Sequence, residues 1–134
     1  LANDEYSAEL TSYDPMLLNG IGVIGENGGG AQLLIENGLR ALGVSVQYVF
    51  RTNDNGAMQA MARNGLAPAI MPLLAVDAHD PNVRVLPLNP PIPPRQILIA
   101  LPRPALRTAA ATRFAQIAVE VGQSRLNAGG AIPV

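Results

Sequence analysis

Cysteine and lysine are absent from this sequence, and histidine occurs once, as His79. A chain without cysteine forms neither disulfides nor thiolate metal sites, and this absence is typical of proteins in a reducing cytoplasm. One histidine is too few for a histidine-based metal cluster. In the polar stretch DAHDPN we expect His79 to be an exposed loop residue. We therefore predict no metal site.

Charge and long apolar runs are also scarce. The net charge is −1, and all nine basic residues are arginines. Nothing in the electrostatics therefore favours nucleic acid or an anionic membrane as a direct partner. No apolar run approaches the roughly 20 residues that a membrane-spanning helix needs. The chain begins at Leu1 without a secretory leader, and we expect it to be an internal or C-terminal part of a longer cytoplasmic protein.

The sequence does contain enough apolar residues for one compact domain. Of its 134 residues, 49% are hydrophobic. The expected strands are short apolar runs at residues 16–24 (interrupted at 19–20), 44–50, 67–71, 83–88 and 95–101. In the second of these, apolar residues alternate, so we expect Tyr48 and Phe50 to pack in the sheet. Residues 73–76 are expected to form a single turn.

Three helices are expected between and after these strands. The first covers residues 31–42, and Gly43 follows it at the position that favours a left-handed cap. The second begins near Thr52, Asn53 and Asp54, any of which can cap a helix, and it ends at Gly65. The third is capped by Thr108. The apolar residues expected on the three helices are Leu34, Ile35, Leu39 and Leu42; Met58, Met61 and Ala62; and Phe114, Ile117, Ala118 and Val121. Alternating strands and helices predict an α/β domain with parallel pairing.

The order of these segments resembles the effector-binding domain of LysR-type transcriptional regulators. The most informative stretch is NGLAPAIMP, Asn64 to Pro72, in which a helix ends and a short strand begins. The segments that match the family's order are DPMLLNGIGVIG, ENGGG, AQLLIENGLRALG, VSVQYVF, TNDNGAMQAMARNG, LAPAIMP, VRVLPLNPP, RQILIALPR and TAAATRFAQIAVEV. One departure is Ala67, which stands where the family commonly has a second glycine and precedes Pro68.

The resemblance implies a type II periplasmic-binding-protein-like fold, a doubly wound sheet with flanking helices, of which only the later half is present. The partial domain would cover residues 1–126, with a second lobe at about 10–88 and a segment returning to the first lobe at about 95–122. Residues 127–134 would form a flexible tail. The first lobe and the helix-turn-helix have no counterpart in the sequence.

The resemblance also implies a sensor and not an enzyme, with no cofactor. A small-molecule effector would bind between the lobes and change how a dimer or larger oligomer presents its DNA-binding domains. Contact with DNA would require a helix-turn-helix outside this chain. A solute-binding protein of the same fold is the alternative among binding proteins.

The predicted effector site combines a glycine-rich loop with the end of a strand. Asn27, Gly28, Gly29 and Gly30 precede a helix, so their backbone amides could hold a carboxylate or another anion. Thr52 and Asn53 follow the next strand and should open toward the same side, because ligands gather at the carboxyl ends of parallel strands. The alternative is that the loop is a simple turn and that Asn53 only caps a helix.

One enzyme-like pattern competes with this interpretation. GIGVIG places Gly20, Gly22 and Gly25 in the order of a dinucleotide-binding motif, and Asp54 follows the next strand, which suggests a nucleotide-dependent oxidoreductase. However, the polar ENGGG separates the motif from the helix, and Asp54 lies beyond the expected spacing of about 20 residues. We therefore favour a chance match. No catalytic residue is predicted.

Overall fold

The computed structural model describes residues 11–77 and 79–127. The chain divides into two compact units, Leu1–Arg95 and Gln96–Val134. The expectations for residues 1–10 and for the tail from residue 128 onward lie outside the described residues.

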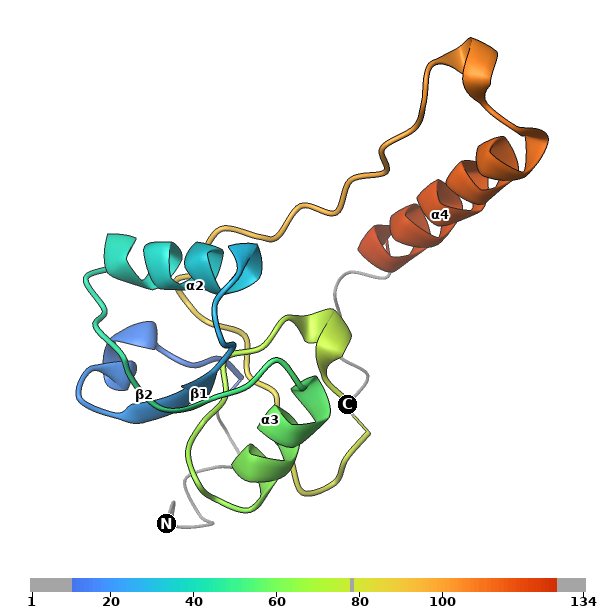
Figure 1. The fold of residues 1–134 in the computed structure, drawn as a ribbon. Helices are drawn as coiled ribbons and strands as arrows, with labels where there is room; N and C mark the ends of the chain where they lie inside the picture. The colour runs from blue at the N-terminus through green and yellow to red at the C-terminus, as the bar shows by residue number, and fades with distance from the viewer. Residues whose placement is uncertain (1–10, 78, 128–134) are drawn as a thin grey trace. The chain divides into compact units, whose positions relative to one another are not determined.

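The first unit is built on a small parallel sheet. Strand β1 (Gly22–Gly25) pairs in parallel with β2 (Gln47–Arg51). On the other edge of β1, the amide of Ile24 donates to the carbonyl of Pro68 (2.9 Å), and the amide of Ile70 donates to the carbonyl of Ile24 (3.3 Å). Helices α2 (Gly30–Ala41) and α3 (Asn55–Arg63) lie on opposite sides of the two strands (Figure 1). The α/β architecture with parallel pairing is thus confirmed.

Buried side chains fill both faces of this sheet. On the α2 side the core consists of Leu18, Val23, Ile35, Leu39 and Val44. Ile24 follows Val23 in β1 and therefore faces the opposite side, where α3 contacts β1. Ile24 and Met58 of α3 are both fully buried. Each such apolar side chain stabilises the fold by roughly 1.5–3 kcal/mol relative to an exposed one.

The helix ends follow the local sequence signals. Asp54 is the N-cap of α3, and its Oδ1 accepts a hydrogen bond from the amide of Ala57 (3.1 Å). Gly43 and Gly65 follow α2 and α3 with φ of +78° and +74°, the left-handed conformation that glycine adopts at least cost. Both predicted glycine stops are confirmed, and so is the turn near residue 73, a 3-10 helix η2 (Leu73–Ala75).

A bulge in β2 changes which of its side chains are buried. Val23 pairs with Tyr48 but Ile24 pairs with Phe50, so Val49 is an extra residue in the ladder. The bulge shifts the alternation by one residue, and as a result Phe50 is 40% exposed. The prediction that Phe50 packs in the sheet is wrong, whereas Tyr48 does pack against the core. The Val49 side chain occupies the space that a Cβ at Gly22 would need.

Several predicted strands are not strands. Residues 16–18 belong to a 3-10 helix, η1 (Pro15–Leu18), because Asp14 caps it and Pro15 starts it. The segment 67–71 contributes one bridge, between Ala69 and Ile24. Within 83–88 only Leu88 forms a bridge, with Tyr13, and 95–101 pairs with nothing in the described chain. The apolar pattern is present in all these segments, but a strand also needs a partner edge.

The second unit consists of an extended chain, a 3-10 helix η3 (Pro104–Leu106) and the long helix α4 (Ala109–Asn127). Thr108 caps α4 as predicted, since its Oγ1 accepts a hydrogen bond from the amide of Ala111 (3.1 Å). The expected apolar face of α4 is exposed, with Phe114 68% accessible. Ala115 is the only buried side chain of this unit among the residues described. No helix within the described residues is long and apolar enough to span a membrane.

Candidate functional site

The predicted glycine-rich loop joins β1 to α2 and has an open surface. Gly28 and Gly29 have φ of +93° and +99°, a conformation that side chains with a Cβ rarely adopt. A Cβ at Gly28, Gly29 or Gly30 would meet no atom within 4 Å. The loop therefore requires glycine for its backbone conformation, and its outer side is free of neighbouring atoms.

The structure brings this loop to the end of β2, as the sequence predicted. The amide of Asn27 donates to Oδ1 of Asn53 (2.9 Å), and the amide of Thr52 donates to the carbonyl of Gly25 (3.0 Å). Asn53 does not cap α3, because Asp54 occupies that position. The capping alternative for Asn53 is thus wrong. The Asn53 side chain instead ties the end of β2 to the glycine loop.

The backbone amides of the loop divide into two groups. The amide of Asn27 is already used by Asn53. The amides of Gly28, Gly29 and Gly30 donate to no group in the described part of the chain, and α2 has no side-chain cap. These free donors lie at the positive end of the helix dipole, where a carboxylate or another anion is stabilised.

Sequence reasoning missed a polar network behind the loop. Gln32 of α2 is only 2% exposed. Its Oε1 accepts from the amide of Glu26 (2.9 Å), while its Nε2 donates to the hydroxyl of Tyr48 (2.7 Å) and to Oε1 of Glu36 (2.9 Å). Gln32 lies three residues before Ile35 and seven before Leu39, on the buried stripe of α2. A polar residue in an apolar helical stripe was the sequence signal that could have identified it.

Arg51, the last residue of β2, closes the network. Its guanidinium forms an ion pair with Glu36 (2.9 Å) and lies 3.8 Å from the centre of the Tyr48 ring. The hydrogen bond from Gln32, and then that from Arg51, lower the pKa of Glu36 below its ordinary value of 4.5. Burial raises the pKa of the Tyr48 hydroxyl above its ordinary value of 10.0. At neutral pH the carboxylate is therefore charged and the phenol is protonated.

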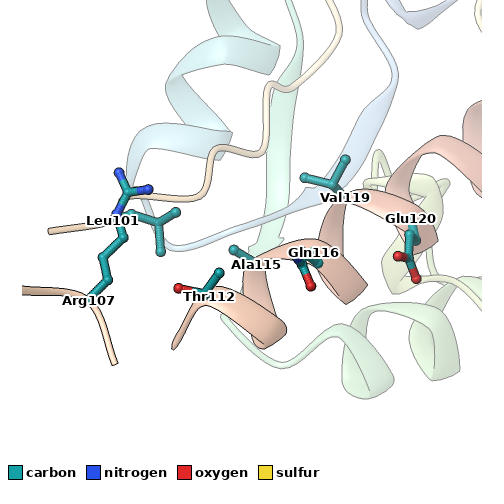
Figure 2. Close-up of a pocket in the computed structure, with 7 residues that line it drawn as sticks. All are labelled: Leu101, Arg107, Thr112, Ala115, Gln116, Val119 and Glu120. Carbon is teal, nitrogen blue, oxygen red and sulfur yellow. The ribbon is translucent and has the colours of Figure 1, made fainter. Parts of the chain in front are cut away.

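Two hollows lie away from the predicted loop. In the second unit, an open hollow of about 410 Å³ lies between Leu101 and Arg107 on one side and five residues of α4 on the other (Figure 2). Another, of about 280 Å³, lies between α2 and the chain leading into β2. None of Asn27, Gly28, Gly29, Gly30, Thr52 and Asn53 lines either hollow. Both hollows are therefore separate from the predicted loop.

Other chemistry finds no support in the geometry. Gly22 and Gly25 of GIGVIG lie within β1, and α2 begins only at Gly30. A dinucleotide-binding motif instead turns directly from strand to helix, so the oxidoreductase interpretation fails on this motif. His79 is exposed, as predicted. Among the described residues, no three histidine or acidic side chains gather as metal ligands would.

The chain was compared with models of protein families. The model of the LysR substrate binding domain matches residues 14–123, most of the chain. Comparisons with curated proteins and with solved structures gave no match. The family match implies a type II periplasmic-binding-protein-like fold, consistent with the small parallel sheet flanked by α2 and α3. The family match over most of the chain therefore shows that this chain belongs to the LysR substrate binding domain family, the ligand-binding regulatory domain of LysR-type transcriptional regulators.

Proposed function

We propose that this chain senses a small anionic effector, such as a carboxylate, through the loop between β1 and α2. The observation that carries the proposal is the set of three unused amides at Gly28, Gly29 and Gly30, at the N-terminal end of α2. Thr52 and Asn53 complete the site, because Asn53 holds the loop through the amide of Asn27. Effector binding would shift the conformation of a cytoplasmic regulator and thereby control transcription.

We further propose that the chain is the later half of the sensor domain. In this proposal residues of about 10–88 form the second lobe, and residues of about 95–122 return to a first lobe. Support comes from the second unit, where apolar residues such as Leu98 and Phe114 are mostly exposed. Another lobe would bury them and supply the opposing wall of the effector cleft.

The loop proposal is tested by titrating this chain with sodium acetate while the amide resonances of Gly28, Gly29 and Gly30 are followed by NMR. We expect these resonances to shift at millimolar acetate. Gly29→Val should abolish the shift, because a β-branched side chain fills the open side and disfavours positive φ. Gly43→Val is the matched control, since Gly43 also has positive φ but lies at the other end of α2. Unchanged resonances in the wild-type chain would remove this loop from the site.

The missing-lobe proposal makes a separate prediction about affinity. With one wall of the cleft, the chain should bind small acids weakly or not at all. A calorimetric titration that gave sub-micromolar affinity for any small acid would contradict it. In the intact regulator, Gly29→Val should block the response to effector and leave operator binding unchanged, because DNA contact belongs to a helix-turn-helix outside this chain.

We also propose that the exposed apolar segments promote self-association into dimers or larger oligomers. The extended segment around Leu98 has exposed apolar side chains, and its backbone pairs with no other strand among the residues described, a combination that favours association with another chain. Leu98→Glu should reduce association in sedimentation experiments at high concentration. Leu33→Glu, at an exposed position of α2 in the first unit, is the control. A wild-type chain that sediments as a monomer at high concentration would refute the proposal.

A further inference from the structure

We propose that Gln32 and Arg51 are positioning residues that fix the glycine loop in the shape that presents its amides to a ligand. This inference rests on the proposed function of the loop. Neither residue is expected to touch the ligand. Both act on the backbone of Glu26, the residue that leads into the loop.

Glu26 is held on both of its backbone polar groups by side chains. Its amide donates to Oε1 of Gln32 (2.9 Å), and its carbonyl accepts from Nη1 of Arg51 (3.0 Å). The two side chains come from different elements, α2 and β2, so they hold the two peptide groups that flank the Glu26 Cα. The next amide, that of Asn27, is held by Asn53. Gly28, the first residue after these clamped peptides, begins the open part of the loop.

The orientation of Gln32 is fixed by its own partners. Nε2 donates its two hydrogens to Glu36 and Tyr48, so Oε1 is left as the acceptor for the Glu26 amide. A flipped amide would place an NH₂ group against the N–H of Glu26. Arg51 is likewise fixed by Glu36 and by the Tyr48 ring. The network therefore holds one arrangement of the loop.

A second buried glutamine provides a matched control in the same unit. Gln59 of α3 is 9% exposed and clamps Asp77 in the same way. Its Nε2 donates to the carbonyl of Asp77, and its Oε1 accepts from the amide of Asp77, both at 2.9 Å. Substituting Gln59 thus removes a buried clamp of equal type without touching the glycine loop.

The test is amide hydrogen exchange measured on the full chain by NMR. Gln32→Met keeps the size of the side chain and removes its hydrogen bonds. We expect exchange at the Glu26 amide to become about tenfold faster, the factor that corresponds to the loss of one hydrogen bond of ordinary strength. Amides of α3 should not change. Gln59→Met should accelerate exchange at Asp77 and leave Glu26 unchanged.

A purely structural role predicts another pattern. If Gln32 only stabilises the unit as a whole, Gln32→Met would accelerate exchange at all core amides equally, and this result would overturn the inference. Arg51→Gln should perturb the fold less than Gln32→Met does, because the arginine side chain is 36% exposed. It should reduce the acetate response of the loop, whereas Arg40→Gln on the exposed side of α2 should not.

The positioning inference and the proposed function fail in different ways. Loss of the acetate response in Gln32→Met, with the response retained in Gln59→Met, supports the inference. A wild-type chain without an acetate response refutes the anion site. In that case the exchange data still test whether Gln32 and Arg51 hold the backbone of Glu26. Unchanged exchange at Glu26 in both Gln32→Met and Arg51→Gln refutes the clamp, whatever acetate does.

Discussion

The two units of this chain have similar apolar patterns but very different burial. In the first unit, Leu39 of α2 is 1% exposed and packs with Val23 and Val44 over the sheet. In the second, Leu98 is 83% exposed although it lies in the apolar run ILIAL. Periodicity reports what a segment is able to bury and not whether its partner is present. The second unit thus has an apolar sequence that is typical of a buried element, but its apolar side chains are exposed.

The two units also differ in their backbone hydrogen bonding. Strand β1 is paired on both edges, with β2 on one side and, through Ile24, with Pro68 and Ile70 on the other. The extended chain at 95–101 forms no ladder in the described part of the molecule. Unpaired backbone groups of an apolar strand are costly if buried and attract partners if exposed. The first unit is therefore expected to carry the stability of the chain.

The largest expected effect comes from replacing a leucine by alanine, once in each unit. Leu39→Ala should lower the free energy of unfolding by about 2–5 kcal/mol, because it leaves a cavity in the core. Leu98→Ala should change it by less than about 0.5 kcal/mol, as exposed positions usually do. Denaturant unfolding followed by circular dichroism measures both. Equal losses would mean that the second unit is packed in solution and would break the comparison.

Glycine-to-alanine substitutions should differ in sign between the units. At Gly38 of α2, a Cβ would lie 2.8 Å from Cβ of Ile92 and 3.0 Å from Cδ of Pro93. Gly38→Ala should therefore destabilise the chain by about 1–3 kcal/mol despite the better helix propensity of alanine. At Gly122 of α4 a Cβ meets nothing, so Gly122→Ala should raise the helicity of α4, with a gain of up to about 1 kcal/mol. Thermal melts and the helical signal test both, and a loss at Gly122 would point to a hidden contact.

The smallest expected effect is a pH dependence confined to the first unit. Because the folded-state pKa of Glu36 lies below its ordinary value of 4.5, its stabilisation is present at neutral pH. It is lost as pH falls below 4.5 through the folded-state value. The stability difference between the wild type and Glu36→Gln should thus shrink in acid. The control is Glu120→Gln at an exposed position of α4, which should leave the stability at neutral pH unchanged. A difference that is independent of pH would exclude this role for Glu36.

The candidate site was only partly predictable. The glycine loop and the end of β2 could be placed together from the sequence, because parallel strands end on the same edge. The contact between Asn27 and Asn53 depends on atoms 26 residues apart, and no local pattern specifies it. The same holds for Gln32, whose partners lie on the loop, on α2 and on β2. Long-range hydrogen bonds form only after the chain has packed.

The sequence by itself determined where α3 and α4 begin and where α2 and α3 end. Asp54, Thr108, Gly43 and Gly65 act on neighbouring amides and on their own backbone angles, and these are local effects. Tertiary structure alone decided which apolar runs became strands. Residues 22–25 pair with two neighbouring segments, whereas 95–101 pair with none in the described part of the chain, and Phe50 is turned outward by the bulge at Val49. The physical reason is that a helix satisfies its backbone hydrogen bonds internally, while a strand must find them on another segment.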